Sequence, residues 1–473
     1  MQTLVVDDSR TVRRILRTVL EEAGFEVLEA ENGREALLQL DQAPGVGLVV
    51  TDWEMPEMDG ISLLRNLRDH PDYRTLPVVM VTQETRAARI REALQAGATE
   101  YIMKPFTRET LLEKLATLGC TAHPRASSRV LVVDDSVIVR RVLQERIDED
   151  ARLELTGLAT DGAQALELIA ADRPDIVVLD VEMPGMNGLD TLRELRTRAP
   201  DLPVVMFSVL TERGAQATLE ALSLGAVDYI TKPSGTGDPD EVRRRIDEEL
   251  LGKLRAILDE RDRRPAPPIA SRAPLMAPDP RLVVVGASTG GPEVLRTMLA
   301  PLPDIFPAPI VVAQHMPPVF TLHFAKRLAR QVGLEVHEGA DGMALEAGQV
   351  IIAPGGKDTT VVARDGGFVL KVEPGQGKGP KPSADHLFRS AAEAAGETTL
   401  GIVLTGMGRD GMLGAAAIAA ARGRVLVQDR QSSVVSSMPR AVIESGVAER
   451  ELAPVQLADA LLEITARTTE TQT

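Results

Sequence analysis

The stretch Gly286-Ala-Ser-Thr-Gly-Gly-Pro292 carries the residue types best suited to chemistry in this sequence. It follows an apolar run, Leu282 to Val285, and precedes an amphipathic segment, Glu293 to Leu299. This order predicts a strand, a glycine-rich turn and a helix, which would set Ser288 at the mouth of a sheet beside backbone N–H groups. Such a position suits either an attacking hydroxyl or a bound phosphate.

A phosphate-binding turn is the weaker interpretation of this stretch. A dinucleotide-binding turn would have glycine where Ser288 stands, and an acid at the end of the next strand to bind ribose. That strand instead ends in Ala313-Gln-His-Met316. No Gly-Lys-Ser/Thr follows the turn, so a Walker loop is also absent from the sequence.

A nucleophilic serine needs a base and an acid at neighbouring strand ends. His315 ends the next predicted strand, and Asp410 follows a strand predicted over Leu400–Leu404. We therefore predict that Ser288, His315 and Asp410 form a catalytic triad at one sheet edge. Glycines around Met407 leave backbone N–H groups open, so its N–H is a candidate donor to an oxyanion. The alternative is structural: His315 caps a strand and Asp410 is an ordinary turn residue.

The first half of the sequence contains a domain-sized duplication. Three blocks recur at nearly one constant spacing, which indicates two copies of a whole domain rather than a short repeat. The blocks are Leu4-Val-Val-Asp-Asp-Ser9 and Leu131-Val-Val-Asp-Asp-Ser136, Thr51-Asp-Trp-Glu-Met-Pro56 and Leu179-Asp-Val-Glu-Met-Pro184, and Tyr101-Ile-Met-Lys-Pro105 and Tyr229-Ile-Thr-Lys-Pro233.

Each copy places acids after its first and third predicted strands, a hydroxyl after the fourth and a lysine after the fifth. Carboxylates that converge at one edge repel each other unless a cation or a function requires them, and oxygen ligands in an open site favour Mg²⁺. We predict that the third-strand acid attacks phosphorus and also binds the metal, while the first-strand pair binds the metal and the hydroxyl and lysine bind the phosphoryl group. The third-strand acid is Asp52 in the first copy and Asp180 in the second, and the first-strand pairs are Asp7 with Asp8 and Asp134 with Asp135. The hydroxyls are those of Thr82 and Ser208, and the lysines are Lys104 and Lys232.

Short apolar runs alternate with helical patterns along the whole chain, which predicts an α/β protein with three doubly wound parallel sheets. In the first copy the expected strands are Leu4–Val6, Val27–Glu29, Leu48–Thr51, Val78–Thr82 and Tyr101–Met103. The expected domains are residues 1–121, 129–247 and 281–468, with a helical and proline-rich linker over 248–280.

Composition narrows the class of protein. The net charge of −16 argues against a nucleic-acid-binding surface. A single cysteine, Cys120, excludes internal disulfides and fits a reducing compartment. The sequence has no signal-peptide pattern and no apolar stretch long enough to span a bilayer. We therefore expect a cytoplasmic protein that does not insert into membranes.

The duplicated acidic blocks resemble the receiver domains of two-component response regulators. The resemblance implies flavodoxin-like domains that bind Mg²⁺ and accept phosphoryl groups on Asp52 and Asp180 from a phosphohistidine of a sensor histidine kinase. Tyr101 and Tyr229 precede the two lysines by three residues. They are either aromatic switches that report phosphorylation or edge-of-core packing.

The third domain resembles the chemotaxis protein-glutamate methylesterases. The matching blocks are Gly286-Ala-Ser-Thr-Gly-Gly-Pro292, Gln314-His-Met-Pro-Pro318, Ile352-Ala-Pro-Gly-Gly356, Lys381-Pro-Ser-Ala-Asp385, Leu404-Thr-Gly-Met-Gly-Arg-Asp-Gly411 and Met438-Pro439. The resemblance implies a Rossmann-like esterase domain without a cofactor, with the same triad and with Thr289 and Met407 near the oxyanion. It also implies methylated chemoreceptors as substrates, glutamine deamidation at the same site, and a receiver that caps the site until phosphorylated.

Three positions depart from the family pattern. Asp358 stands where the family often has histidine, and Ser436 and Ser437 stand where it often has an aromatic residue and a glycine. The extra N-terminal receiver is a further departure. Two alternatives therefore stay open: a non-enzymatic phosphorelay adaptor, and an esterase that acts on a different substrate.

Overall fold

The computed structural model describes residues 2–471 except 43–44, 71, 83–91, 94–95, 105, 107–109, 112–113, 116–126, 151, 233–242, 263–278, 376 and 378. Cys120 and most of the proline-rich linker lie outside the described residues. The chain divides into two compact units, Met1–Ser127 and Ser128–Thr473, which are taken in turn below.

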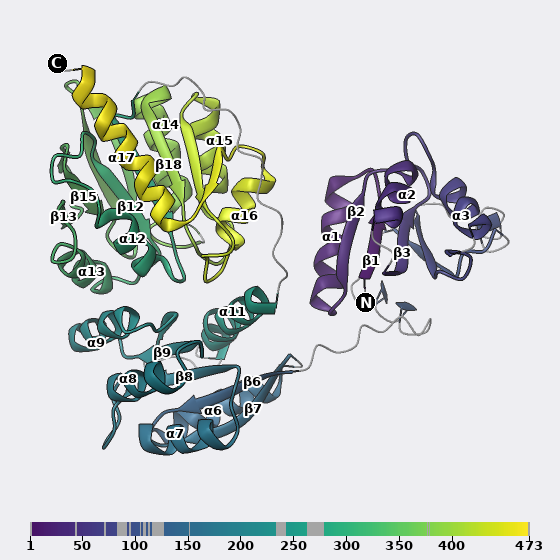
Figure 1. Cartoon of the computed structure of the whole chain (residues 1–473), viewed down its shortest axis with the longest axis horizontal. Helices are drawn as coiled ribbons and strands as arrows, with labels where there is room; N and C mark the ends of the chain where they lie inside the picture. The colour runs from purple at the N-terminus through teal and green to yellow at the C-terminus, as the bar shows by residue number, and fades with distance from the viewer. Residues whose placement is uncertain are drawn as a thin grey trace. The chain divides into compact units, whose positions relative to one another are not determined.

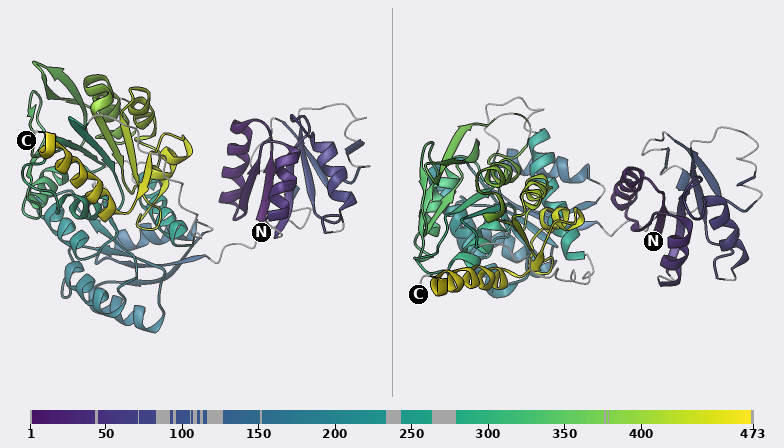
Figure 2. Two further views of the ribbon diagram at one scale, coloured as in Figure 1. Left: turned by 45° about the horizontal axis from the view of Figure 1, so that its top comes forward. Right: turned by 90° about the horizontal axis from the view of Figure 1, so that it is seen from above.

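The first unit is a five-stranded parallel sheet in the order β2-β1-β3-β4-β5, with helices on both faces (Figures 1 and 2). Its described elements are β1 (Gln2–Val6), α1 (Arg10–Glu22), β2 (Glu26–Ala30), α2 (Gly33–Gln42), β3 (Val46–Asp52), α3 (Gly60–Asp69), β4 (Val78–Thr82) and β5 (Glu100–Met103). Asp59 caps α3 by accepting a hydrogen bond from the Ser62 N–H at 2.8 Å.

The second unit begins with a sheet of the same kind, in the order β10-β9-β8-β6-β7. Its elements are β6 (Ser128–Val133), α6 (Val137–Asp148), β7 (Leu153–Ala159), α7 (Gly162–Ala171), β8 (Ile176–Asp180), α8 (Gly188–Arg198), β9 (Val204–Ser208), α9 (Glu212–Ser223) and β10 (Asp228–Thr231). A π-helical turn, η1 (Ile246–Leu251), leads into α11 (Gly252–Asp262). Leu254 and Ile257 of α11 are buried in the same apolar cluster as Val130 and Val132 of β6. This helix therefore packs on the second receiver-like sheet.

A seven-stranded parallel sheet in the order β13-β15-β12-β11-β18-β19-β20 completes the second unit. Its strands are β11 (Leu282–Ala287), β12 (Ile310–Gln314), β13 (Glu335–Glu338), β15 (Gln349–Ile352), β18 (Thr399–Val403), β19 (Arg424–Gln428) and β20 (Arg450–Leu452). The associated helices are α12 (Gly291–Leu299), α13 (Phe320–Leu328), α14 (Ala384–Ala395), the 3₁₀ turn η2 (Gly396–Thr398), α15 (Met412–Ala420), α16 (Ser437–Glu444) and α17 (Pro454–Thr471).

The burial of the central strand β11 explains why this strand is an unbroken apolar run in the sequence. Every residue of β11 is buried, because helices cover both faces of the sheet. Its alternate residues enter different apolar clusters: Val283 and Val285 join one, and Leu282 and Val284 join the other. The first cluster includes α12, beside which α17 packs (Figure 1).

A small antiparallel sheet was not predicted from the sequence. It has the order β14-β17-β16, with β14 (Ala344–Leu345), β16 (Lys357–Arg364) and β17 (Gly367–Pro374). The prediction of three doubly wound parallel sheets is otherwise confirmed. The predicted domain boundaries stay predictions.

Candidate functional sites

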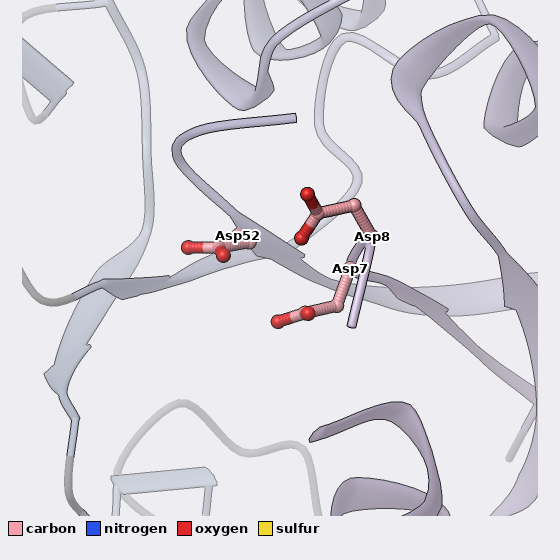
Figure 3. Close-up of side chains that lie close together, drawn as sticks. All are labelled: Asp7, Asp8 and Asp52. Carbon is pink, nitrogen blue, oxygen red and sulfur yellow. The ribbon is translucent and has the colours of Figure 1, made fainter. Parts of the chain in front are cut away.

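The first acidic pocket lies at the carboxyl ends of β1 and β3. Carboxylate oxygens of Asp7, Asp8 and Asp52 all lie within 4.8 Å of one another (Figure 3). Lys104, at the end of β5, places its Nζ 2.7 Å from Asp7 Oδ2 and 2.8 Å from Asp52 Oδ2. Burial raises the pKa of Asp52, and the Lys104 ammonium only partly opposes that effect. Thr82 is buried at the end of β4, as expected for a residue of this edge.

The second pocket repeats this arrangement at the ends of β6, β8 and β10. Oxygens of Asp134, Asp135 and Asp180 lie within 4.8 Å of one another. Lys232 Nζ is 2.7 Å from both Asp134 Oδ2 and Asp180 Oδ2. Burial raises the pKa of Asp180 to about 6, against the opposing effect of Lys232. Ser208 is fully buried at the end of β9, where its hydroxyl donates to the Gly214 carbonyl at 3.3 Å.

Both pockets have the donor set that a hard divalent cation prefers. Each offers three carboxylates whose oxygens are close enough to share one ion, and in each one acid is exposed to solvent. Mg²⁺ therefore fits the residues that are present. Receiver domains typically bind this ion through such acidic residues.

The turn after β11 carries Ser288. The Gly291 N–H donates to the Ser288 carbonyl at 2.8 Å, and Gly290 has φ 79° and ψ −9°, which together make a type II turn. Such a turn needs glycine at its third position. A Cβ on Gly290 would also lie 2.6 Å from Val434 Cγ2, so the neighbouring loop leaves no room for a side chain. The sequence of this turn therefore fixes where Ser288 lies.

Strand register brings His315 beside the serine. Ala287 of β11 pairs with Gln314 of β12, so Ser288 and His315 each follow directly at adjacent strand ends. The His315 N–H donates to the Ala287 carbonyl at 2.9 Å. Among the described residues, no hydrogen bond joins the Ser288 hydroxyl to the His315 ring. The structure thus brings these two residues to one sheet edge without a hydrogen bond between their side chains, as is common for hydrolase sites without substrate.

Asp410 contacts His315 directly. His315 Nε2 lies 2.8 Å from Asp410 Oδ2, so the pairing leaves Nδ1 as the ring nitrogen available to accept a proton. Asp410 also accepts hydrogen bonds from the Ala384 and Asp385 N–H groups, at 2.7 and 3.0 Å, and from the Ser383 hydroxyl at 3.0 Å. Burial opposes its charge, but the hydrogen bonds from His315 and from these N–H groups lower the pKa of Asp410.

Sequence reasoning missed the part that α14 plays in holding Asp410. The backbone N–H groups at the start of a helix favour an anion, and Ser383 is the N-cap of α14. The block Lys381-Pro-Ser-Ala-Asp385 contains this N-cap, but only the folded chain brings it against the loop after β18. The N-cap pattern was a usable signal for a helix start, though not for its partner.

The loop after β18 approaches the serine closely. A Cβ on Gly406 would lie 2.7 Å from Ser288 Cβ, so only glycine fits there. Ser437 braces this loop, because its hydroxyl donates to the Gly406 carbonyl at 3.0 Å and accepts from the Gly408 N–H at 3.1 Å. In the described part of the chain, no group accepts the Met407 N–H. That N–H is therefore free to act as a donor.

The other two departures from the family pattern have different surroundings. Asp358 is mostly buried, and its Oδ1 lies 2.7 Å from Lys381 Nζ and 3.0 Å from His386 Nδ1. Ser436 donates to Glu260 of α11 at 2.8 Å through its hydroxyl. Asp358 therefore lies beside Lys381 and α14, and Ser436, which precedes α16, joins the third domain to α11.

Within the second unit, the second receiver-like domain contacts the residue after Ser288. Thr289 donates from Oγ1 to Asp228 Oδ2 of β10 at 2.6 Å, and both residues are buried. Lys253 of α11 pairs with the same carboxylate at 2.8 Å. Tyr229 is buried and stacks on Phe320 of α13, with ring centroids 4.7 Å apart and planes inclined by 3°. Neither Asp228 nor Lys253 was predicted from the sequence to take part in this contact.

The chain is similar to known proteins over each of its three domains. The family described as CheB methylesterase matches residues 283–461, and the response regulator receiver domain matches residues 3–116 and 130–247. A protein-glutamate methylesterase/protein-glutamine glutaminase of Nocardioides sp. is 41% identical over 72% of this chain and 96% of its own length. One from Pseudomonas aeruginosa is 44% identical over 72% and 97%. The solved CheB methylesterase catalytic domain of Thermotoga maritima is 38% identical over 39% of this chain and 99% of its own, with a TM-score of 0.39.

Proposed function

This chain belongs to the protein-glutamate methylesterase/protein-glutamine glutaminase family, and from that premise we propose how its sites carry out and control the reaction. It is a carboxylic ester hydrolase of the CheB type with receiver domains. Its relatives therefore favour an enzyme over a non-enzymatic adaptor. The contact between His315 and Asp410, one strand away from the Ser288 turn, carries the assignment of the catalytic residues.

In the proposed reaction His315 Nδ1 takes the proton of the Ser288 hydroxyl as its oxygen attacks the ester carbonyl of a glutamyl methyl ester. Asp410 holds the ring through Nε2 and stabilises the imidazolium that forms. His315 then returns the proton to the leaving oxygen and methanol departs. Water, deprotonated by the same nitrogen, attacks the acyl-enzyme; the bond to Ser288 breaks, the proton returns to the Ser288 oxygen, and free glutamate leaves. With a glutamine substrate, ammonia leaves in place of methanol.

The negative oxygen of the tetrahedral intermediate needs a donor nearby. The Met407 N–H serves this role in the proposal, because it has no acceptor among the described groups and its loop lies against Ser288. Ser437 fixes the loop that presents it. The departure at Ser437 thus supports the site rather than the substrate groove alone.

The two acidic pockets are the proposed phosphorylation sites. Asp52 and Asp180 would accept the phosphoryl group, while Lys104 and Lys232 would pair with its oxygens. Mg²⁺ would be held by Asp7, Asp8 and Asp52 in the first pocket and by Asp134, Asp135 and Asp180 in the second. When bound, that ion neutralises charge on the transferring group. Thr82 and Ser208 complete the proposed sets, and Ser208 would first release Gly214.

Control by the second receiver follows from its contact with Thr289. In the docked state Asp228 accepts the hydroxyl of the residue next to the nucleophile, and Tyr229 stacks on the esterase domain. Both residues lie on β10, the strand that ends beside Lys232. We propose that the phosphoryl group on Asp180 attracts the Lys232 ammonium. This attraction would shift β10 and release the contacts at Thr289.

The partners follow from the family. A receiver domain requires a kinase as phosphodonor, and a methylesterase requires a methylated substrate, which we propose to be the methylated chemoreceptors. The part of the chain that the structure describes contains no helix long and apolar enough to cross a membrane. A cytoplasmic location, where kinase phosphohistidine forms, completes the proposal.

A serine-directed fluorophosphonate probe tests the assignment. After treatment with a phosphodonor, the wild-type chain should be labelled at one residue and Ser288→Ala should not be labelled. The assignment of Ser288 as the nucleophile would be ruled out if Ser288→Ala were labelled to the wild-type level, or if the phosphorylated wild type were not labelled.

A further inference from the structure

We propose that Gln314 is a positioning residue of the esterase reaction, and that its side-chain amide aims the backbone N–H of Thr289 at the oxyanion. This inference rests on the proposed role of Ser288 as nucleophile. It adds a second donor to the one offered by Met407, and it assigns a function to a buried side chain that touches neither the substrate nor the reacting atoms.

Gln314 lies at the end of β12 and is 2% exposed. Its Nε2 donates to the Ser288 carbonyl at 2.9 Å and lies 3.5 Å from the His315 carbonyl. Both neighbours are acceptors, so the amide must present its nitrogen to them. A single side chain thus ties the strand end that carries the base to the turn that carries the nucleophile.

The Ser288 carbonyl is held from two sides. It accepts from Gln314 Nε2 and also from the Gly291 N–H at 2.8 Å. The carbonyl of the next residue, Thr289, is held in turn by the Thr405 hydroxyl at 2.9 Å. The two peptide planes on either side of Thr289 are therefore fixed by hydrogen bonds.

Peptide geometry then decides where the Thr289 N–H points. In a planar trans peptide the C=O and the following N–H point in opposite directions, and the Ser288–Thr289 peptide is trans. Because the Ser288 carbonyl points towards Gln314 and the start of α12, the Thr289 N–H points away from both. No described residue accepts it. Only a few bonds separate this N–H from the Ser288 hydroxyl, which is the position of an oxyanion donor in other serine hydrolases.

The surroundings of Gln314 indicate that its amide serves to hold the Ser288 carbonyl rather than to stabilise the fold. Its Oε1 is buried without a hydrogen-bond donor among the described residues. A buried acceptor left unpaired destabilises the fold, whereas an apolar side chain of similar length would avoid that penalty. Oε1 also lies so close to α12 that a Cβ on Gly291 would be 2.1 Å from it. Stability alone therefore does not favour glutamine here.

Gln314→Met in the full-length chain tests the proposal, because it keeps the length and removes the donor. After phosphorylation, kcat for methanol release should fall by about 10- to 100-fold with little change in KM, since the loss of one oxyanion donor costs up to about 10²–10³. The inhibition constant of phenylboronic acid, whose serine adduct carries a negative oxygen, should rise by a similar factor.

Thr399→Val is the matched control. Thr399 is a buried residue at the opposite end of β18, and its hydroxyl donates to the Ala391 carbonyl at 3.1 Å. Its loss should lower the melting temperature and leave kcat and the boronate affinity unchanged. Wild-type kcat and boronate affinity in Gln314→Met would overturn the inference, and so would a melting temperature far below that of Thr399→Val. Failure of a fluorophosphonate probe to label Ser288 in the phosphorylated wild type would instead overturn the proposed function.

Discussion

Replacement of Asp228 by alanine should switch the esterase on without phosphorylation. The substitution removes the carboxylate that accepts the Thr289 hydroxyl at 2.6 Å. It leaves Tyr229 and its stack on Phe320 in place. The hydrogen bond to Thr289 is the contact of this carboxylate that reaches the residue next to the nucleophile, whereas its pairing with Lys253 and its bond from the Tyr229 N–H stay within the receiver and α11.

The size of the effect follows from the burial of this contact. Asp228 is 5% exposed and Thr289 is 1% exposed, so the hydrogen bond is shielded from water. A hydrogen bond to a charged group contributes about 1.5–3 kcal/mol. If all of it favours the docked state, its loss shifts the docking equilibrium by about 10- to 150-fold, since about 1.4 kcal/mol is a factor of ten. Part of this free energy is offset, because on undocking water would replace Thr289 at the wild-type carboxylate, which would keep its partner Lys253. We therefore expect a rise of about tenfold.

The assay is the rate of methanol release from methylated receptor by the full-length chain, with and without a phosphodonor. Basal release by Asp228→Ala should rise about tenfold. Stimulation by the phosphodonor should shrink by the same factor, because the fully released rate is common to both proteins. Glu100→Ala is the matched control, since Glu100 precedes Tyr101 in the first receiver as Asp228 precedes Tyr229 in the second. It should leave both rates unchanged.

A basal rate equal to that of the wild type, with full stimulation retained, would refute the reasoning. The hydrogen bond at Thr289 would then contribute nothing to docking. A tenfold rise in the Glu100→Ala control would also count against it, because the effect would not be specific to the second receiver.

Three further predictions concern the pockets and the triad. Asp180→Asn should abolish stimulation by a phosphodonor, whereas Asp52→Asn should only modulate it; equal loss in methanol-release assays would contradict the assignment of control to the second receiver. Asp410→Asn should lower kcat by about 10⁴-fold, because the amide presents a donor where His315 Nε2–H needs an acceptor; retention of a tenth of the activity would contradict the triad. Asp410 has a lowered pKa, so its ionised form stabilises the fold above its ordinary value of 3.8, and this contribution is lost as the pH falls through the lower folded-state value. The difference in free energy of unfolding between wild type and Asp410→Asn should therefore shrink as the pH falls from about 5 to about 2, and a constant difference in denaturant titrations would disprove it.

The parallel sheets could be predicted from the sequence because each strand is a short apolar run followed by a polar residue. The strand predicted over Leu282–Val285 became β11, which extends to Ala287. Burial on both faces makes such strands uniformly apolar, and this pattern is visible without any tertiary information. The antiparallel pair β16 and β17 has exposed and buried residues mixed, so it gave a weaker signal.

The placement of the acids in each pocket, and of Ser288, His315 and Asp410 in the third domain, could also be predicted, because the ends of parallel strands meet at one edge. What the sequence could not supply was the set of contacts between segments far apart in the chain. Ser383 reaches Asp410 only because α14 packs against the loop after β18, and Asp228 reaches Thr289 only because the chain packs two sheets together. Gln314 belongs to a block that was identified in the sequence, Gln314-His-Met-Pro-Pro318. The direction of its side-chain amide, however, depends on the turn that it contacts.

The most direct test of the central claim is methanol release from methylated chemoreceptor by the phosphorylated full-length chain and by its Ser288→Ala variant. The account predicts rapid release by the wild type and a loss of nearly all release in the variant, with phosphorylation of both proteins unchanged. Release by the variant at a rate close to that of the wild type would contradict the claim that the Ser288 hydroxyl performs the attack.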